Sequence, residues 1–156
     1  MNTRARVRIG VGIGIGVLLI GAAMVQGSYS LHAHGEATSV APRSSWMLAP
    51  GKSGFETVSF TRVQTPMPVS GVARNLMVRT LSTQPSDGAM TVIVFKGTAW
   101  TAIQLTIPAG SPAGLYIESL HTGSFNAGEP MWWRVSNSSF SPSAQTGAIS
   151  LEYDPL

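Results

Sequence analysis

Short apolar runs separated by residues that favour turns are the feature that most constrains how residues 55–156 can fold. Ile103, Leu105 and Ile107 alternate with polar residues, and Pro108 ends this run. Successive side chains of a strand point to opposite faces, so the alternation indicates a strand with one buried face. Similar runs predict further strands at residues 57–63, 76–79, 91–95, 131–135 and 149–153. No segment after residue 27 has a helical period, and we therefore expect an all-β domain.

The predicted strand at residues 131–135 contains two adjacent tryptophans, Trp132 and Trp133. Neighbouring residues of a strand lie on opposite faces, so one tryptophan fills the core and the other is exposed or buried against a partner. Trp100 and Arg134 join them as candidate interface residues. A subunit contact is favoured over stacking on sugar rings, because few polar side chains nearby could bind hydroxyl groups.

Several turns and core positions follow one another in the order of a known domain. They lie at residues 66–71 (PMPVSG), 74–79 (RNLMVR), 85–88 (PSDG), 92–97 (VIVFKG), 105–107 (LTI), 127–129 (AGE), 133–135 (WRV) and 150–153 (SLEY). In this course residues 55–156 resemble the jelly-roll domain of bacteriophage tail, fibre and other virion proteins and of bacterial surface proteins. Lys96-Gly97 stands where that domain has an Asn-Gly hairpin, and Glu129 replaces an aspartate. The resemblance implies an antiparallel β-sandwich of jelly-roll type in a structural or adhesive module, with no catalytic residues to carry over.

A basic segment followed by an apolar one opens the chain. The apolar run covers residues 9–25, about 17 residues, which at about 1.5 Å per residue just spans a hydrocarbon core. This pattern predicts an N-terminal hydrophobic helix that is an export signal or a transmembrane anchor, with the amino terminus inside and the rest outside. The residues assigned to membrane insertion or export are Arg4, Arg6, Arg8, Gly12, Gly16, Leu18 and Leu19.

Three segments follow from these patterns: a signal peptide or anchor at residues 1–27, a linker at 28–54 and a β-sandwich at 55–156. Gly, Ser, Ala and Pro dominate the linker, which has no sustained period. Within it, the short run at residues 46–48 (WML) is either an edge strand or a hydrophobic plug on the domain. Whether the leader is cleaved or retained stays open.

The charge of the chain argues against a nucleic-acid partner. Lys and Arg together number 10, Asp and Glu 7, and three of the ten cations are the arginines of the leader. The remainder is therefore balanced at seven against seven, so it lacks the basic excess that phosphate binding needs. The chain also has no cysteine. An exported domain without disulfides depends on its core or on oligomerisation for stability.

Residues 32–36 (HAHGE) hold a metal-like cluster, formed by His32, His34 and Glu36. Two imidazoles and a carboxylate suit Cu²⁺ or Zn²⁺, and cleavage after Ala33 would make His34 a copper-chelating amino terminus. Leu31 is a poor residue at the third position before such a cleavage site. The favoured interpretation is two histidines in a flexible linker, and we expect no cofactor.

No catalytic constellation is evident. His121 is the only histidine after residue 34, and it lies in a Gly/Ser-containing segment without a recognised nucleophile turn. We therefore expect a non-enzymatic structural subunit of an extracellular or virion surface assembly. It would be tethered or exported by its leader, contact other surface or virion proteins and form homo-oligomers, with a trimer favoured. The alternatives are a secreted or cell-surface adhesion or glycan-binding module and, less favoured, a periplasmic copper-binding protein.

Overall fold

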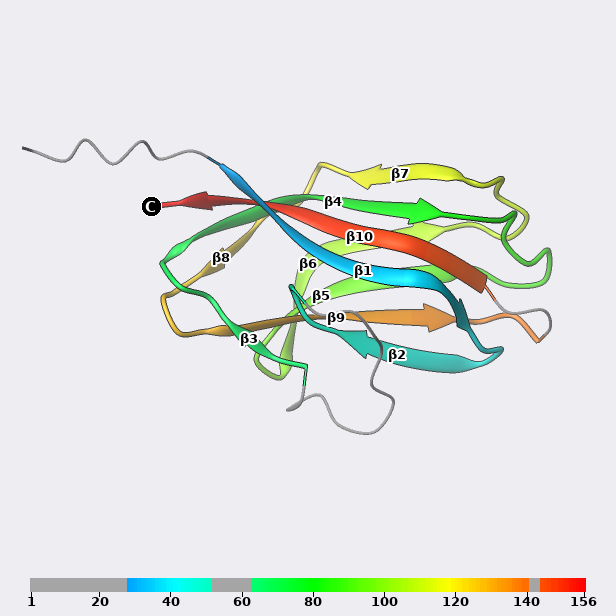
Figure 1. Cartoon of the computed structure of the whole chain (residues 1–156), viewed down its shortest axis with the longest axis horizontal. Helices are drawn as coiled ribbons and strands as arrows, with labels where there is room; N and C mark the ends of the chain where they lie inside the picture. The colour runs from blue at the N-terminus through cyan, green and yellow to red at the C-terminus, as the bar shows by residue number, and fades with distance from the viewer. Residues whose placement is uncertain (1–27, 52–62, 141–143) are drawn as a thin grey trace, which may run out of the picture.

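The computed structural model describes residues 28–51, 63–140 and 144–156, with the backbone alone at 32–39 and 145. In this part of the chain ten strands form two five-stranded antiparallel sheets, and no helix is present. The sheets pack face to face as a β-sandwich (Figure 1). The prediction of an all-β antiparallel fold is confirmed, whereas the predicted N-terminal helix lies outside the described residues.

Each sheet combines strands that are far apart in the sequence. In sheet A the order is β1 (Tyr29–Val40), β10 (Ala144–Pro155), β4 (Gly71–Thr80) and β7 (Gly114–Glu118), and β8 (Gly123–Phe125) also pairs with β4. In sheet B the order is β2 (Ser44–Leu48), β9 (Pro130–Asn137), β5 (Met90–Lys96) and β6 (Ala99–Ile107), and β3 (Thr65–Pro66) also pairs with β9. Among the described strands, β5 and β6 alone are neighbours both along the chain and in a sheet.

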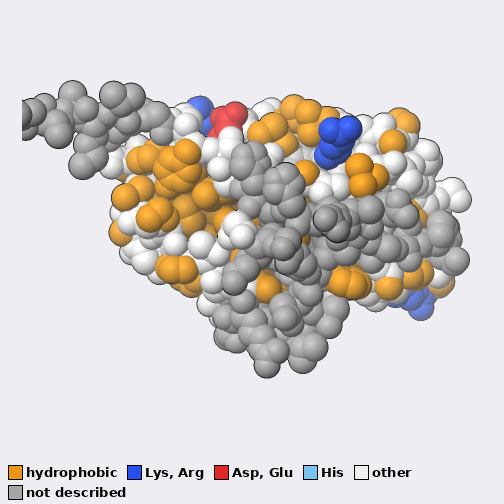
Figure 2. Space-filling model, in the orientation of Figure 1, with side chains coloured by type: hydrophobic (Ala, Val, Ile, Leu, Met, Phe, Trp, Pro, Cys, Tyr) orange, Lys and Arg blue, Asp and Glu red, His pale blue; other side chains and the backbone are white. Residues whose placement is uncertain are grey.

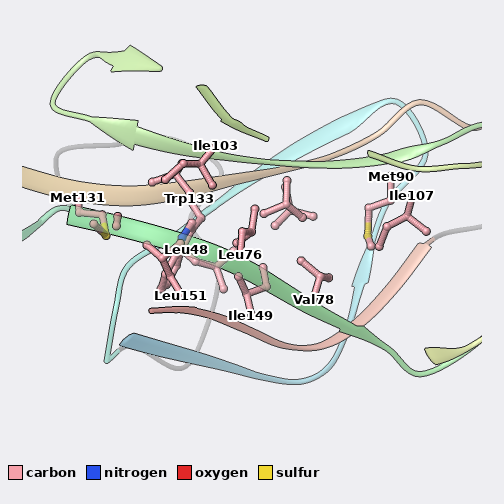
Figure 3. Close-up of a cluster of buried hydrophobic side chains, with 14 of the residues drawn as sticks. Leu48, Leu76, Val78, Met90, Ile103, Ile107, Met131, Trp133, Ile149 and Leu151 are labelled. Atoms are coloured by element: carbon pink, nitrogen blue, oxygen red, sulfur yellow. The ribbon is translucent and has the colours of Figure 1, made fainter. Parts of the chain in front are cut away.

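The core lies between the two sheets and is almost entirely aliphatic and aromatic. Figure 3 shows side chains of sheet A facing side chains of sheet B, among them Leu76, Val78, Ile149 and Leu151 from the first and Ile103, Ile107 and Trp133 from the second. Each large apolar side chain that folding removes from water contributes about 1.5–3 kcal/mol. In a chain without cysteine, this apolar contact between the sheets is the main source of stability.

Most strands lie where alternation predicts them. The runs at residues 76–79, 91–95, 103–107, 131–135 and 149–153 fall within β4, β5, β6, β9 and β10. Along β6, Ile103 and Ile107 are buried while Gln104 and Thr106 are exposed, as the alternation requires. These predictions are confirmed. The strand predicted at 57–63 falls mostly on residues that are not described.

The linker predicted for residues 28–54 is wrong over most of its length. β1 pairs with β10 from Tyr29 opposite Tyr153 onward, and β2 pairs with β9. The short run at 46–48 belongs to β2, an edge strand of sheet B. Of its two interpretations, an edge strand or a hydrophobic plug, the edge strand is confirmed. β1 is rich in small and polar residues and has no clear alternation, because the main-chain hydrogen bonds that hold it to β10 need no particular side chains.

Tyr153 fixes the end of β10 against β4. Its ring is fully buried, and its hydroxyl donates a hydrogen bond to the Val69 carbonyl at 2.8 Å. Gly71 lies beside it, where a Cβ atom would come within 2.4 Å of the Tyr153 ring and 2.6 Å of the Asp154 carbonyl oxygen. The close approach of β4 to β10 therefore requires glycine at this position.

Gly71→Ala should lower the free energy of unfolding by about 2 kcal/mol or more, because backbone or ring must move to admit the methyl group. Gly114→Ala is the matched control, since a Cβ there has its nearest neighbour, the Tyr116 ring, at 4.0 Å. Urea unfolding followed by circular dichroism measures both changes. Equal stability of the two variants would contradict the close packing of Gly71.

Burial raises the pKa of Tyr153 to about 12, with smaller contributions from Tyr29 and Glu129. An unfolded tyrosine ionises near pH 10, so between about pH 10 and 12 the unfolded state holds fewer protons than the folded state. The free energy of unfolding should therefore fall as pH rises through this window, by about 1 kcal/mol per pH unit from Tyr153. Urea unfolding at several pH values should show a shallower slope for Tyr153→Phe, and an unchanged slope would refute the assignment.

Candidate functional site

The four predicted interface residues lie in very different surroundings. Trp133 is fully buried between the sheets, and Trp132 on the opposite face of β9 is only 5% exposed. Arg134 is half-buried, whereas Trp100 is 71% exposed. The prediction that one of the two adjacent tryptophans fills the core is confirmed. The prediction that the other is exposed or covered by a partner is wrong, because the chain itself covers Trp132.

A second hydrophobic cluster on the outer face of sheet B provides this cover. It combines the outward side chains of β5 and β9 with residues from the connection between β2 and β3, namely Ala49, Val63, Ile93, Phe95 and Trp132. Ala49 follows β2 directly, and Val63 lies two residues before the start of β3. The chain thus places apolar residues over the outer face of sheet B, which the sequence did not indicate.

Three aromatic residues form a row across this outer face, hereafter the aromatic row. Phe95 of β5 pairs in register with Trp132 of β9 on one side and Trp100 of β6 on the other. The Phe95 and Trp132 rings stack with centroids 4.1 Å apart, and the Trp132 indole nitrogen donates to the Gly97 carbonyl at 2.7 Å. The Arg134 guanidinium lies 5.2 Å from the Phe95 ring centroid. Two members of the row are therefore held rigidly, and the third, Trp100, faces solvent.

The outward side of β6 continues from Trp100 with polar, uncharged side chains. Gln104 and Thr106 are exposed there, and none of the nine residues of β6 carries a charge. An irregularity between the pairs of Ile93 and Phe95 separates Trp100 from these two residues. The Thr101 hydroxyl holds this irregularity in place by donating a hydrogen bond to the Val94 carbonyl at 2.9 Å. The outer side of β6 thus combines one exposed indole with amide and hydroxyl groups.

Sheet A exposes a different kind of surface at its edge strand. Leu115 and Ile117 of β7 are 61% and 54% exposed, and Leu120 after the strand is 88% exposed. We call these three residues the β7 surface. Met77 of β4 extends it, since Met77 lies opposite Ile117 in the register. Three large aliphatic side chains exposed this closely together are typical of an interaction site.

The sequence did not reveal the β7 surface, although the alternation of residues 114–118 (GLYIE) was visible. A simple hydrophobicity rule would turn Leu115 and Ile117 inward. The structure instead places Tyr116 and Glu118 on the inner side, opposite Val78 and Leu76 of the core. The only signal in the sequence was the charged residue Glu118, which alternates with the aliphatic residues. The structure gives Glu118 its own partners in the following loop.

Those partners come from the loop that follows β7. The Glu118 carboxylate accepts hydrogen bonds from the main-chain nitrogens of Leu120 and His121, at 2.8 and 3.1 Å. The same oxygen lies 2.9 Å from Nδ1 of His121. This arrangement closes a tight turn and presents Leu120 to solvent. It gives Glu118 and His121 a role in positioning the loop.

Glu129 organises the turn before β9 and pairs with Lys96, a cation near the aromatic row. Its carboxylate accepts from the Asn126 main-chain nitrogen at 2.7 Å and lies 3.5 Å from the Lys96 ammonium. The hydrogen bond from Asn126, with help from Lys96, lowers the pKa of Glu129. Gly128 adopts φ of +83° within this turn, which glycine tolerates best. Glutamate therefore supports the turn that the resemblance associates with aspartate.

At one end of sheet A, three charged side chains pair with one another, whereas Arg79 of β4 is exposed opposite Leu115. The Arg74 guanidinium lies 2.8 Å from Asp154 and 3.5 Å from Glu152, and Asn75 donates to Glu152 at 2.7 Å. Figure 2 shows one face of the molecule, where charged side chains are sparse and hydrophobic ones are widespread among the described residues. A surface of this kind offers little to an ionic ligand.

Other predicted residues cannot be placed as a site. The seven leader residues lie outside the described part of the chain, and among the described residues no helix is long and apolar enough to cross a membrane. His32 and His34 lie in β1 opposite Ser150 and Ala148, but their side chains and that of Glu36 are not described. The described side chains contain no group of three or more potential ligands that could hold a metal ion.

No protein-family model matches the chain, and a search of curated proteins gives no match. Among solved structures, the chain is similar to one in "Structure of infectious bursal disease virus Gt strain", with 12% sequence identity and a TM-score of 0.36. The similarity covers 81% of this chain but only 31% of the viral one. A likeness at this level does not establish a relationship.

Proposed function

We propose that the chain is a non-enzymatic structural subunit of an extracellular or virion surface assembly, in which copies associate through a face of the β-sandwich. The β7 surface carries this proposal. Leu115 and Ile117, which lie on the outer face of β7, and Leu120, two residues after the strand, are each more than half exposed. Exposing such side chains to water is unfavourable, and packing them against another protein surface removes that cost.

The strand order supports a sandwich of jelly-roll type. With the short β3 and β8 set aside, eight strands remain. Numbered along the chain, they lie in the order first, eighth, third and sixth in sheet A, and second, seventh, fourth and fifth in sheet B. This order is that of two interlocked Greek keys, and jelly rolls of this kind build virus capsids and lectins. The resemblance of residues 55–156 to domains of phage virion proteins agrees with it.

A second copy is the partner that the β7 surface fits best. β7 is an edge strand of sheet A, so a neighbour can approach it without displacing another described strand. The side chains are aliphatic, and the charged residue nearest in the register is Arg79 of β4, which is exposed opposite Leu115. Homo-oligomers bury surfaces of this composition and close by rotational symmetry. A trimer is favoured, as is common among jelly-roll proteins.

The leader supplies the location in this proposal. Arg4, Arg6 and Arg8 before an apolar run would send residues 28–156 outside the cytoplasm, with the run either cleaved or retained as a membrane anchor. Other surface or virion proteins are then the neighbours. Nucleic acid is not a proposed partner, because the basic excess is confined to the leader.

Leu115→Lys combined with Ile117→Lys should weaken self-association at least about tenfold, since charged side chains replace the centre of an apolar contact. Sedimentation velocity of the full chain in a mild detergent, over a range of protein concentrations, measures the change. Both positions are exposed, so the thermal unfolding temperature should stay within a few degrees of the parent's.

Val69→Lys combined with Leu156→Lys is the matched control, because it places the same charges at exposed aliphatic positions away from β7. This control should associate as the parent does. The proposed interface would be ruled out if the parent is monomeric at all concentrations, or if the β7 variant and the control associate equally.

A further inference from the structure

We propose that the outer side of β6 is a binding site for neutral polysaccharides, with Trp100 as its stacking platform and Gln104 and Thr106 as its hydrogen-bonding groups. The proposal is independent of the assembly proposed above, since it concerns the other sheet. Its support is the combination of an exposed indole on a rigid base with uncharged polar groups along one strand.

Trp100 is positioned for stacking by the residues beneath and beside it. Its register partner Phe95 is buried and stacks on Trp132, so the strand pair that carries Trp100 is held firmly. A platform that is already rigid loses little conformational entropy when a ligand binds. The C–H groups on the face of a sugar ring pack favourably on the electron-rich face of an indole. An indole that is 71% exposed leaves room for such a ring.

The polar groups that follow Trp100 along β6 can form hydrogen bonds with the hydroxyl groups of a sugar. Gln104 offers both an amide donor and an acceptor, and Thr106 offers a hydroxyl that already lies 3.4 Å from the Thr91 hydroxyl. From Trp100 to Thr106 the strand extends about 15–20 Å, allowing for its irregularity. A ligand of several linked sugar units could therefore stack on Trp100 and bind these polar groups at once.

The absence of charge along β6 decides the class of ligand. None of its residues is ionised, and the nearby Lys96 is already engaged by Glu129 and by the Ser124 carbonyl, at 3.5 and 3.3 Å. Arg134, the other described cation on this face, lies on β9 against the Phe95 ring, two strands away from β6. Among the described residues, β6 thus offers a phosphorylated or nucleic-acid ligand no cation of its own. A neutral, hydroxyl-rich chain needs only the stacking surface and hydrogen-bonding groups that β6 presents.

The test uses the full chain in a detergent without a sugar headgroup. The probes are neutral hexasaccharides of β-1,4-glucose, α-1,4-glucose, β-1,4-mannose and β-1,4-N-acetylglucosamine. Tryptophan fluorescence and isothermal titration calorimetry report binding. At least one hexasaccharide should bind and change the emission, and Trp100→Ala should weaken its binding at least about tenfold. Trp100→Phe, which keeps a smaller stacking face, should give an intermediate affinity.

Phe140→Ala is the control, because Phe140 is an equally prominent exposed aromatic that lies under Arg43 and outside β6. It should bind the hexasaccharide as the parent does. Binding should also persist in the Leu115→Lys, Ile117→Lys variant, which separates this site from the assembly surface.

Two results would overturn the proposal. The first is that no hexasaccharide binds at 10 millimolar, on the order of the weakest affinity expected of such a site. The second is that Trp100→Ala binds a hexasaccharide as tightly as the parent does. If Trp100→Ala instead lowers the association of the chain in sedimentation velocity and no sugar binds, the outer side of β6 is a contact between copies.

Discussion

The register of β9 is the constraint on which the rest of the sandwich depends. This strand lies between β2 and β5 in sheet B, and it carries Trp133 on its inner side and Trp132 on its outer side. A slip of one residue would exchange the two tryptophans and move every neighbouring side chain to the wrong face. Trp133 fits the space between the sheets, whereas Trp132 fits against Phe95 and donates to the Gly97 carbonyl. Both faces of sheet B therefore require the same register.

That register also explains why the two sheets present different surfaces. The outer face of sheet B is filled near its centre by the cluster around Trp132, whereas its β6 margin is exposed, where the aromatic row ends in Trp100. Sheet A has no such cover at β7, and its edge exposes Leu115 and Ile117. One surface combines an aromatic ring with hydrogen-bonding groups, and the other is aliphatic. They are suited to partners of different chemistry.

Sequence periodicity predicted the strands whose two faces differ in polarity. It missed strands such as β1, whose side chains show no alternation of apolar and polar residues. The run from Ile103 to Ile107 and the strand around Trp133 were predictable, because burial imposes alternation on them. β1 was not, since pairing with β10 rests on main-chain hydrogen bonds and the strand is rich in small and polar residues. The cover over Trp132 was also beyond prediction, because it depends on where the connection after β2 runs. Of the candidate interface residues, only the exposure of Trp100 fits a surface role.

The case of β7 shows why hydrophobicity alone misjudges an edge strand. Glu118 is buried on the inner side, where hydrogen bonds from the main chain of Leu120 and His121 compensate the carboxylate for lost water. An inward charge on a short edge strand disfavours unlimited strand-to-strand pairing. Leu115 and Ile117, in contrast, remain available on the outer face. β7 therefore disfavours open-ended edge pairing while exposing two aliphatic side chains on its outer face, which suits the closed assembly of copies proposed above.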